Sequence, residues 1–567
     1  MNKPTEGQAG TLTGAEAVVE MLKAQGVEIL FGLCGDTSLP FYDSLARLPH
    51  GMRHILTRDE RSAAYMADGY ARVSGKVGVC EGPSGGGATY MVPGLAEANE
   101  SSVPVLCVNS DISVAARGRY TLTELDQATL MRPVTKWNSV LDRAQDIPRV
   151  FRTAFNQMTT GRPGAAHVGL PFDVQNGTVD RADVWGDASL GRYPSQRVAP
   201  DPHLVERAAE LLRSSARPVF ICGGGVVIAN AEAELLKLAE RLSAAVATTI
   251  SGKGSISEDN PLAVGVVGSN GGTPETRAIV DQADLVVFVG CRAGSVTTER
   301  WRHPAPGKTK VIHLDVDPAV FGANYPVDVP LAGDAQLALA ALNEALGKVR
   351  RPLDVTTTQK AKEQKFARFH QLALSDDKPI KPERVVAEAS QALDPDAIVV
   401  ADAGTPCPYF SAYYQVRSSG RRFFSNRAHG ALGYSMPAAI GAHFARPQVK
   451  CVAVMGDGSF GFTCGELETA VRYRLPITFV VISNSSYGWI KAGQKSGYGQ
   501  RYFSVDFDPI DHAAVAAAFG VKSWRVTEPK DLGRVLKEAL EQGGPSLVDI
   551  VCQPLHEAKA PVSEWIA

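Results

Sequence analysis

Short, strongly apolar runs alternate along the chain with longer stretches in which apolar residues recur every three or four positions. Residues 13–26 open with a capping-box pattern from Thr13 to Glu16, carry an apolar stripe and reach Gly26, which predicts a helix. Residues 27–32 predict a strand, and the same alternation continues to residue 171. Buried strands separated by helices are typical of a parallel sheet that has helices on both faces.

Two polar stretches interrupt this alternation, at residues 187–202 and 347–378, and we expect both to be linkers. The alternation resumes after each of them. The first of these later blocks opens with the run 218–225, and the strongest strand candidates in both blocks are residues 285–290, 310–315, 397–402, 452–455 and 477–482. The sequence therefore predicts an α/β protein of three doubly wound parallel-sheet domains, at residues 1–185, 200–345 and 380–567.

Length and composition agree with three α/β domains, and they limit the kinds of binding partner that we expect. A chain of 567 residues has room for three domains of ~150–200 residues each. Apolar residues make up 44% and charged residues 21%, as in soluble globular proteins. The 58 basic and 60 acidic residues leave a formal net charge of −2, so we expect neither nucleic acid nor an anionic membrane as a partner.

The cysteines and the N-terminus predict a cytoplasmic protein. The nine cysteines are scattered, without a CxxC pair or zinc-ligand spacing, and their odd number fits reduced thiols. The first residues lack the apolar run of a signal peptide. No stretch approaches the ~20 apolar residues that span a bilayer.

The most informative motif is Gly-Asp-Gly at residues 456–458, which follows the apolar run 452–455. Asn484 comes 27 positions after Asp457, behind the next predicted strand. Because consecutive parallel strands end at one edge of a sheet, the two side chains are expected to converge, and their oxygens suit Mg²⁺. A Gly-rich turn between a strand and a helix also presents backbone N–H groups to an anion. The alternative is a plain Asp-Gly turn with an unrelated Asn turn, but the pairing of the two motifs favours the metal site.

Gly-Asp-Gly followed some two dozen residues later by Asn resembles the signature of thiamine-diphosphate enzymes, nearest to the acetolactate synthase and pyruvate decarboxylase group. The resemblance extends over essentially the whole chain. It implies that Asp457, Asn484 and the carbonyl of Ser486 hold Mg²⁺, and that Gly458 and Ser459 contact the diphosphate. The three domains would then be pyrimidine-binding, central and diphosphate-binding.

Further cofactor contacts follow from the same resemblance. Gly404, Thr405 and Tyr487 match positions beside the cofactor. The carbonyl of Gly430 would accept a hydrogen bond from the 4′-amino group of thiamine, and Leu432 would be the apolar wedge under the bent cofactor. A plain core leucine is the alternative for Leu432.

Glu60 is the candidate catalytic residue. Residues 59–72 resemble the family pattern His-Glu-x-x-Ala…Ala-Asp-Gly-Tyr-Ala-Arg, with Asp59 in place of the histidine. Thiamine loses its C2 proton to its own 4′-imino group, which requires a proton donor at N1′, and a glutamate with a raised pKa suits that task. The alternative is an acid that merely complements a helix dipole.

In relatives the matching glutamate and aspartate face one cofactor from different subunits. The resemblance therefore implies a homodimer or homotetramer with its active site at the subunit interface.

The chain departs from the family where relatives meet substrate. Residues 84–90 and 110–111 differ from the usual motifs, so we expect the acceptor to differ too, and the donor stays open. Arg117 and Arg119 are candidates to hold a substrate carboxylate, and solvated loop arginines are the alternative.

The middle block leaves its ligand open. Glycines at 223–225 follow a strand without completing GxGxxG, which favours a structural turn over a phosphate site. Residues 290–298 partly resemble the flavin-contacting segment of acetolactate synthases but lack its aspartates. Bound FAD and an empty or ADP-like site both remain open.

Together these features predict an enzyme, a transferase or lyase that uses thiamine diphosphate and Mg²⁺ to cleave or form a C–C bond next to a carbonyl. The favoured reaction is decarboxylation of a 2-oxo acid followed by carboligation, as in acetolactate synthase. A simple 2-oxo acid decarboxylase or lyase and a flavin-dependent 2-oxo acid oxidase are the alternatives. A non-enzymatic nucleotide-binding scaffold would require both halves of the cofactor motif to be accidental.

Overall fold

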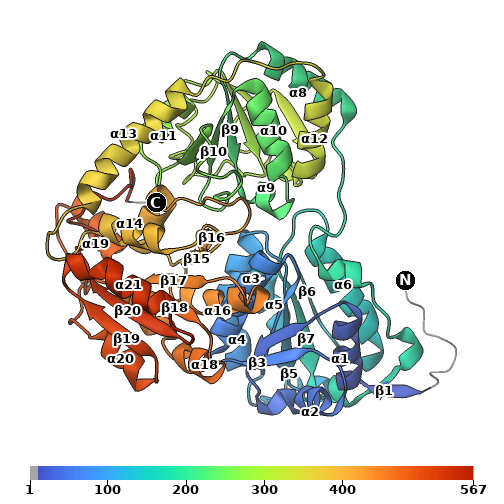
Figure 1. Cartoon of the computed structure of the whole chain (residues 1–567). Helices are drawn as coiled ribbons and strands as arrows, with labels where there is room; N and C mark the ends of the chain where they lie inside the picture. The colour runs from blue at the N-terminus through green and yellow to red at the C-terminus, as the bar shows by residue number, and fades with distance from the viewer. Residues whose placement is uncertain (1–9, 566–567) are drawn as a thin grey trace. The chain divides into compact units, whose positions relative to one another are not determined.

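A computed structural model describes residues 10–565. It contains three six-stranded sheets, each parallel throughout (Figure 1). This confirms the predicted class of three parallel-sheet α/β domains. The described chain divides into two compact units. Unit 1 holds residues 10–196, 428–447 and 465–473, and unit 2 holds residues 197–427, 448–464 and 474–565.

The first sheet belongs to unit 1 and has the strand order β3-β2-β4-β5-β7-β6. Its strands are β2 (Ile29–Gly32), β3 (Arg53–Leu56), β4 (Gly78–Gly82), β5 (Val105–Asp111), β6 (Trp137–Val140) and β7 (Ala166–Pro171). The helices of this part of the chain are α1 (Gly14–Ala24), α2 (Leu39–Arg47), α3 (Glu60–Ser74), α4 (Gly86–Glu100), α5 (Gln127–Met131), α6 (Ile147–Thr159) and α7 (Phe172–Asn176). Two short strands, β1 (Thr11–Thr13) and β8 (Thr178–Asp180), pair antiparallel. The capping box predicted at Thr13 and Glu16 is present at the start of α1.

The second sheet belongs to unit 2 and has the order β11-β10-β9-β12-β13-β14. Its strands are β9 (Pro218–Cys222), β10 (Ala245–Thr248), β11 (Ala263–Val266), β12 (Leu285–Val289), β13 (Lys310–Asp315) and β14 (Val329–Ala332). Its helices are α8 (Pro202–Ser214), α9 (Gly224–Ile228), α10 (Glu232–Leu242), α11 (Pro274–Asp281) and α12 (Ala335–Ala345). Alternate residues of β12 enter separate apolar clusters, Val287 one and Phe288 the other, because both faces of a parallel sheet are covered.

The third sheet, also in unit 2, has the order β16-β15-β17-β18-β20-β19. Its strands are β15 (Ile398–Ala401), β16 (Phe423–Ser425), β17 (Cys451–Gly456), β18 (Ile477–Ser483), β19 (Lys522–Val526) and β20 (Ser546–Val551). Helices of this part of the chain are α14 (Pro382–Ala392), α15 (Pro406–Tyr413), α16 (Ser435–Ala445), α17 (Asp457–Thr463), α18 (Glu466–Arg472), α19 (Gly488–Gly497), α20 (His512–Ala518) and α21 (Leu532–Leu540). Of these, α16 and α18 belong to unit 1.

Short 3₁₀ helices occur in several connections: η1 (Asp36–Ser38), η2 (Val114–Ala116), η3 (Arg132–Val134), η4 (Ala144–Asp146), η5 (Arg181–Asp183), η6 (Ala188–Gly191), η7 (Pro318–Val320) and η8 (Pro529–Asp531). Within residues 10–565, no helix combines the length and the apolar character that a bilayer crossing requires.

The strand orders reveal two topologies. Counted within each sheet, the first and third sheets both run 2-1-3-4-6-5, whereas the second runs 3-2-1-4-5-6, the dinucleotide-fold order. In each sheet the chain winds outward in two directions from a switch point. The switch lies between β2 and β4, between β9 and β12, and between β15 and β17. Ligands of doubly wound folds bind at the carboxyl ends of the strands beside such a point.

One predicted linker is wrong in part, because α13 (Thr356–Ala373) fills most of residues 347–378. Its buried positions are spaced three or four apart, but they include polar residues: Thr358, Ala361, Lys365, Phe369 and Ala373. A buried stripe that contains a threonine and a lysine does not read as apolar, so the helical period was hidden.

Candidate active site

The Gly-Asp-Gly turn lies where β17 ends and α17 begins. Gly456 is the last residue of β17 and Asp457 the first of α17, so the carboxyl group sits at the carboxyl edge of the third sheet. Gly456 pairs with Ile482 of the parallel strand β18, which brings the turn after β18 beside Asp457. Burial raises the pKa of Asp457 above its ordinary value, while hydrogen bonds from nearby backbone N–H groups oppose the rise.

The turn after β18 holds the Asp457 carboxylate through its backbone. The N–H groups of Asn484 and Ser485 donate to Oδ2 at 2.7 and 2.6 Å. The N–H of Gly458 donates to Oδ1 at 2.8 Å. Three backbone donors fix the carboxylate firmly, because hydrogen bonds to an ionised acceptor are the strong ones.

The side chain of Asn484 lies between two hydroxyl groups. Its Nδ2 donates to Thr405 Oγ1 at 3.4 Å, and its Oδ1 accepts from Ser486 Oγ at 3.1 Å. Thr405 follows β15 closely, and the preceding Gly404 has a φ of +93°, which only glycine adopts readily. Asp457, Asn484 and Thr405 therefore converge from three neighbouring strand ends, next to the switch point between β15 and β17.

The carbonyl of Ser486 is turned away from its bridge partner. Ser486 pairs with Asp506 in an antiparallel bridge. The N–H of Tyr487 donates to the Val505 carbonyl at 2.8 Å. On the other side of the bridge, the N–H of Phe507 donates to the Ser485 carbonyl at 3.1 Å. In this pattern the N–H and C=O of the central pair point outward.

These groups fit a Mg²⁺ site. A carboxylate, an amide oxygen and a backbone carbonyl are hard oxygen donors, and so few protein ligands leave positions for phosphate oxygens and water. Among residues 10–565 there is no cluster of three or more His, Cys, Asp or Glu side chains suited to a metal.

Gly458 and Tyr487 are matched in shape. A Cβ at Gly458 would lie 2.8 Å from a ring carbon of Tyr487, so only glycine allows the ring this close. Tyr487 also packs edge-on against Phe507, with 5.4 Å between ring centroids. Ser459 is buried in the first turn of α17.

Glu60 is the first residue of α3, and Asp59 caps that helix by accepting from the N–H of Arg61 at 2.7 Å. Only 7% of Glu60 is exposed. Burial raises the pKa of its carboxyl above the ordinary value; a hydrogen bond from its own N–H opposes the rise, and the negative charges of Asp59 and Glu81 add to it.

Two glycines make room for the Glu60 side chain. A Cβ at Gly82, the last residue of β4, would lie 3.3 Å from Glu60 Cγ, and a Cβ at Gly87 of α4 would lie 3.2 Å from its Oε1. Glu60 therefore lies at the carboxyl edge of the first sheet, close to the end of β4 at the switch point between β2 and β4.

The segment that precedes α16 carries Gly430 and Leu432 and belongs to unit 1, as Glu60 does. Gly430 has a φ of +79° and Gly433 a φ of +83°. Leu432 is half-buried and lies outside the apolar core, unlike the core leucine that was its alternative. The predicted site residues thus form two groups: Glu60, Gly430 and Leu432 in unit 1, and the diphosphate and metal residues in unit 2.

Comparisons with known proteins identify the family. Three family models match the chain: the N-terminal TPP binding domain of thiamine pyrophosphate enzymes at residues 12–130, their central domain at 205–342 and their C-terminal TPP binding domain at 402–550.

The chain belongs to the thiamine pyrophosphate enzyme family.

Curated relatives extend over nearly the whole chain. A probable acetolactate synthase large subunit of Methanocaldococcus jannaschii is 37% identical over 96% of this chain and 92% of its own length. The acetolactate synthase of Arthrospira platensis is 32% identical, over 95% and 94%. The isozyme 3 large subunit of Escherichia coli is 32% identical, over 94% and 92%. The chain is therefore a thiamine-diphosphate-dependent, acetolactate synthase-like enzyme, which confirms the resemblance drawn from the motifs.

In this thiamine pyrophosphate enzyme, Arg117 and Arg119 have different surroundings. Arg117 Nη1 lies 2.6 Å from Asp142 Oδ1, and its Nη2 lies 3.7 Å from Asp111 Oδ2. Arg117 is therefore an ion-paired loop residue in this conformation, while Arg119 is exposed.

The glycine turn of the central domain is used for packing. The N–H of Gly223 donates to the Val289 carbonyl at 2.8 Å, and the N–H of Gly225 donates to the Gly290 carbonyl at 3.1 Å. A Cβ at Gly223 would lie 2.1 Å from the Gly290 carbonyl. These glycines let two strand ends touch, and the N–H groups of Gly223 and Gly225 are used in that contact.

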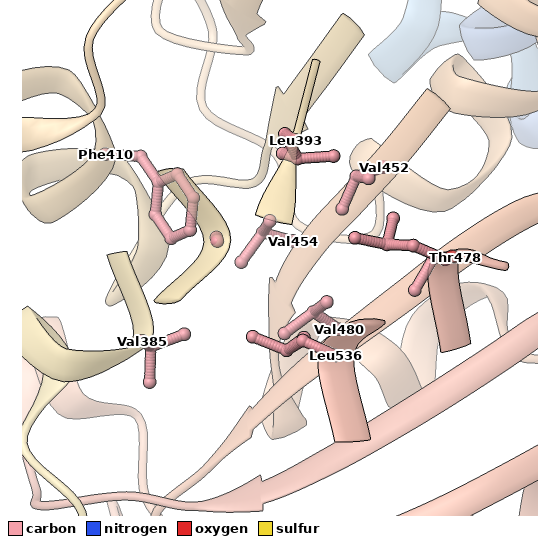
Figure 2. Close-up of a pocket in the computed structure, with 10 residues that line it drawn as sticks. Val385, Leu393, Phe410, Val452, Val454, Thr478, Val480 and Leu536 are labelled. Atoms are coloured by element: carbon pink, nitrogen blue, oxygen red, sulfur yellow. The ribbon is translucent and has the colours of Figure 1, made fainter. Parts of the chain in front are cut away.

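A small gap in unit 2 is part of the core and not a substrate site (Figure 2). Its lining side chains come from the third sheet and the helices packed on it, and they are apolar apart from one threonine: Val385, Ala389, Leu393, Phe410, Val452, Val454, Thr478, Val480, Leu536 and Leu540. Such a lining offers nothing to bind a carboxylate or a phosphate.

Sequence reasoning missed Glu97 of α4, a buried acid that contacts the backbone of the segment carrying Gly430. Its one signal is its place among small and apolar residues, between Ala96 and Ala98, where an exposed acid is not expected.

Proposed function

We propose that this enzyme uses Mg²⁺-bound thiamine diphosphate to decarboxylate a 2-oxo acid and to join the resulting acyl unit to a second carbonyl compound. The observation that carries the proposal is the Asp457 carboxylate, held by the N–H groups of Asn484 and Ser485 beside Thr405, in a chain of this family. The names of the relatives, acetolactate synthases, support the carboligation step.

In this proposal, Mg²⁺ is held by Asp457, Asn484 Oδ1 and the Ser486 carbonyl. The diphosphate meets the surrounding turns, formed by Gly404, Thr405, Gly458, Ser459 and Tyr487. When bound, thiamine diphosphate supplies a carbon nucleophile for the substrate carbonyl and an electron sink when CO₂ leaves.

Glu60 holds the proton on which this chemistry depends. A carboxyl group with a raised pKa stays protonated closer to neutral pH, so it can donate a hydrogen bond to N1′ of the cofactor. Burial also keeps water away from that proton. Gly430 offers its backbone carbonyl to the 4′-amino group, and Leu432 supports the bend of the cofactor.

We further infer a homodimer or homotetramer, because each unit exposes large apolar side chains near its candidate site. In unit 1 they follow the carboxyl ends of strands of the first sheet: Leu39, Tyr90, Tyr120, Leu122 and Phe172. In unit 2 they follow β17 and β18: Phe462, Tyr487, Ile490, Tyr498 and Phe503. Apolar surface of this kind marks a contact site, and a second copy of the chain would cover it.

We also infer that the enzyme is cytoplasmic. The nine unpaired cysteines agree with a reducing compartment, the cytoplasm.

A substrate panel tests the proposed function. The protein is loaded with thiamine diphosphate and Mg²⁺ and given single 2-oxo acids, alone or with a second oxo acid or aldehyde, while CO₂ and ligated 2-hydroxyketone are both measured. The expected result is CO₂ release with ligated product and loss of both on chelating Mg²⁺.

Other outcomes have defined meanings. CO₂ with free aldehyde only would make the enzyme a simple decarboxylase. A bound flavin that bleaches on adding a 2-oxo acid would make it an oxidase. No calorimetric binding of thiamine diphosphate with Mg²⁺ would refute the proposal altogether.

A further inference from the structure

Three charged side chains of unit 1 are buried together. Asp68 and Arg72 lie on α3 and Glu97 on α4, with 0%, 7% and 1% of their surface exposed. Arg72 Nε donates to Asp68 Oδ2 at 2.8 Å, and its Nη2 donates to Glu97 Oε1 at 3.2 Å. Burying charges is costly even when they are paired, and apolar residues often stabilise a core better. The remaining contacts of this triad therefore indicate what it does.

Glu97 reaches the start of the segment 429–434. Its Oε2 accepts from the backbone N–H of His429 at 2.8 Å and from that of Gly430 at 3.4 Å. Its Oε1 also accepts from Ser101 Oγ at 2.7 Å. The carboxylate is thus held from behind by Arg72 and Ser101, and it presents its other oxygen to the segment.

Asp68 holds the end of the same segment. The hydroxyl of Tyr434 donates to Asp68 Oδ2, and Tyr434 is fully buried. Its ring packs edge-on against Tyr65, with 5.1 Å between the centroids. The segment held by these anchors contains Gly430 and Gly433, both with positive φ. Glycines lose more backbone freedom on ordering than other residues, so a segment that contains two of them needs external contacts to stay in one conformation.

We propose that Glu97 is a positioning residue which, together with Arg72 and Asp68, fixes residues 429–434 so that Gly430 and Leu432 are held ready for the pyrimidine end of the cofactor. The proposal rests on the proposed function, since it assigns Gly430 and Leu432 to cofactor binding. The triad itself touches neither substrate nor cofactor.

Two substitutions separate this role from a purely structural one. Glu97→Asp keeps the charge opposite Arg72 but draws the carboxylate back by one methylene from the N–H of His429. Glu97→Gln keeps the length and an oxygen that can accept from His429, but it removes the charge that Arg72 needs. If Glu97 positions the segment, Glu97→Asp should disturb the conformation of residues 429–434 more than Glu97→Gln does. If Glu97 only forms a stabilising ion pair with Arg72, Glu97→Gln should instead lower the stability of the whole protein more than Glu97→Asp does.

Hydrogen exchange on the full-length, cofactor-free protein provides a measurement that does not depend on activity. In Glu97→Asp the amides of residues 429–434 should exchange roughly tenfold faster, because a hydrogen bond to a charged acceptor is lost. Calorimetry in the presence of Mg²⁺ should show thiamine diphosphate binding weakened by a similar factor. Glu97→Gln should lower the melting temperature yet change exchange and cofactor affinity less.

Glu100→Gln is the matched control, because Glu100 lies on the same helix with 44% of its side chain exposed. It should leave exchange and affinity unchanged. Wild-type exchange and cofactor affinity in Glu97→Asp would overturn the proposal, and so would damage to the segment that is larger in Gln than in Asp. If the wild-type protein binds no thiamine diphosphate, the proposed function fails, and the assignment of this anchor to the cofactor fails with it. Altered exchange would then show a loop anchor alone.

Discussion

Glu60 is a costly residue for the folded chain. Burial raises the pKa of its carboxyl, so between the unfolded and folded pKa values the native state binds more protons than the unfolded state. The free energy of unfolding therefore falls as pH rises through that interval. Above it, the native chain carries the full cost of a desolvated carboxylate.

Glu60→Gln should therefore raise the melting temperature at pH 8 while it abolishes turnover, since a neutral amide has no charge to desolvate. The gain should shrink as pH is lowered and vanish below about 4, where the wild-type carboxyl is protonated in both states. Thermal unfolding across pH, together with an activity assay, measures both effects. Glu210→Gln, on the exposed face of α8, is the control that should change neither. Near-wild-type turnover in Glu60→Gln would remove the catalytic assignment.

Asp457→Asn tests the metal site without removing the side chain. The amide oxygen can still accept from the N–H groups of Asn484 and Ser485, and only the hydrogen bond from the Gly458 N–H is lost, so the fold should persist. The lost negative charge should weaken Mg²⁺-dependent binding of thiamine diphosphate by tenfold or more, about 1.4 kcal/mol. Calorimetric titration with and without Mg²⁺ measures this, and Asp508→Asn, at an exposed position of a nearby loop, is the control. Unchanged dependence on Mg²⁺ would contradict the assignment of Asp457.

Sequence reasoning found residues whose partners lie on neighbouring strands. Asp457 and Asn484 are 27 positions apart, one strand-to-strand step in a parallel sheet, and the structure joins them through a hydrogen bond. Glu97 and His429 are 332 positions apart, and no sequence pattern around either residue predicts its contact with the other. The catalytic, cofactor and metal roles assigned to the site residues stay predictions.

Among the helices, α3 and α16 are in backbone contact. A Cβ at Gly69 of α3 would lie 2.1 Å from the carbonyl oxygen of Ala438, and a Cβ at Gly441 of α16 would lie 1.9 Å from that of Met66. Both helices border candidate site residues, since α3 begins with Glu60 and α16 follows Leu432. Their close approach depends on these two glycines.

Gly69→Ala should therefore destabilise unit 1. Alanine favours a helix by about 1 kcal/mol over glycine, but a methyl group 2.1 Å from a carbonyl oxygen forces the helices apart, at a cost of about 1–3 kcal/mol or more. Calorimetry should show a lower melting temperature. Gly86→Ala at the start of α4, where a Cβ would have no atom within 4 Å, should show no such loss. A Gly69→Ala protein as stable as the wild type would contradict the close packing.

At the scale of elements, the pattern was informative wherever burial and polarity agree. The sequence predicted the strand at residues 310–315 with the bounds of β13. It missed α13, because Lys365 is buried on the inner face of that helix. Long polar side chains that enter a core erase the contrast on which such predictions depend.

For the whole molecule, the exposed apolar side chains predict assembly. Leu122→Glu places a charge on a residue that is 82% exposed near the candidate site of unit 1, so it should weaken association of two copies. Sedimentation velocity should show a smaller species for this variant than for the wild type, and activity per chain should fall on dilution. Val198→Glu, at a residue 63% exposed in the segment before α8, should leave assembly intact. A wild-type protein that is monomeric and fully active at high dilution would refute the shared site.

The overall class was readable from the sequence, since alternating buried strands and amphipathic helices leave few options besides parallel sheets. The strand order was not. The 2-1-3-4-6-5 and 3-2-1-4-5-6 sheets have the same alternation along the chain and differ in the side and the position at which crossovers return. The domain limits 1–185, 200–345 and 380–567 remain predictions.

Unit 1 is built from chain segments that are far apart in the sequence, and this affects which recombinants of related enzymes can fold. Its helices α16 and α18 come from residues 428–447 and 465–473, far along the chain from residues 10–196. Recombination that swaps the N-terminal third of two relatives would leave α3 facing a foreign α16, across a contact that tolerates no added methyl group. Functional chimeras should therefore be those in which both distant segments travel with the N-terminal third, and a library of crossovers would recover them in preference to single-junction hybrids.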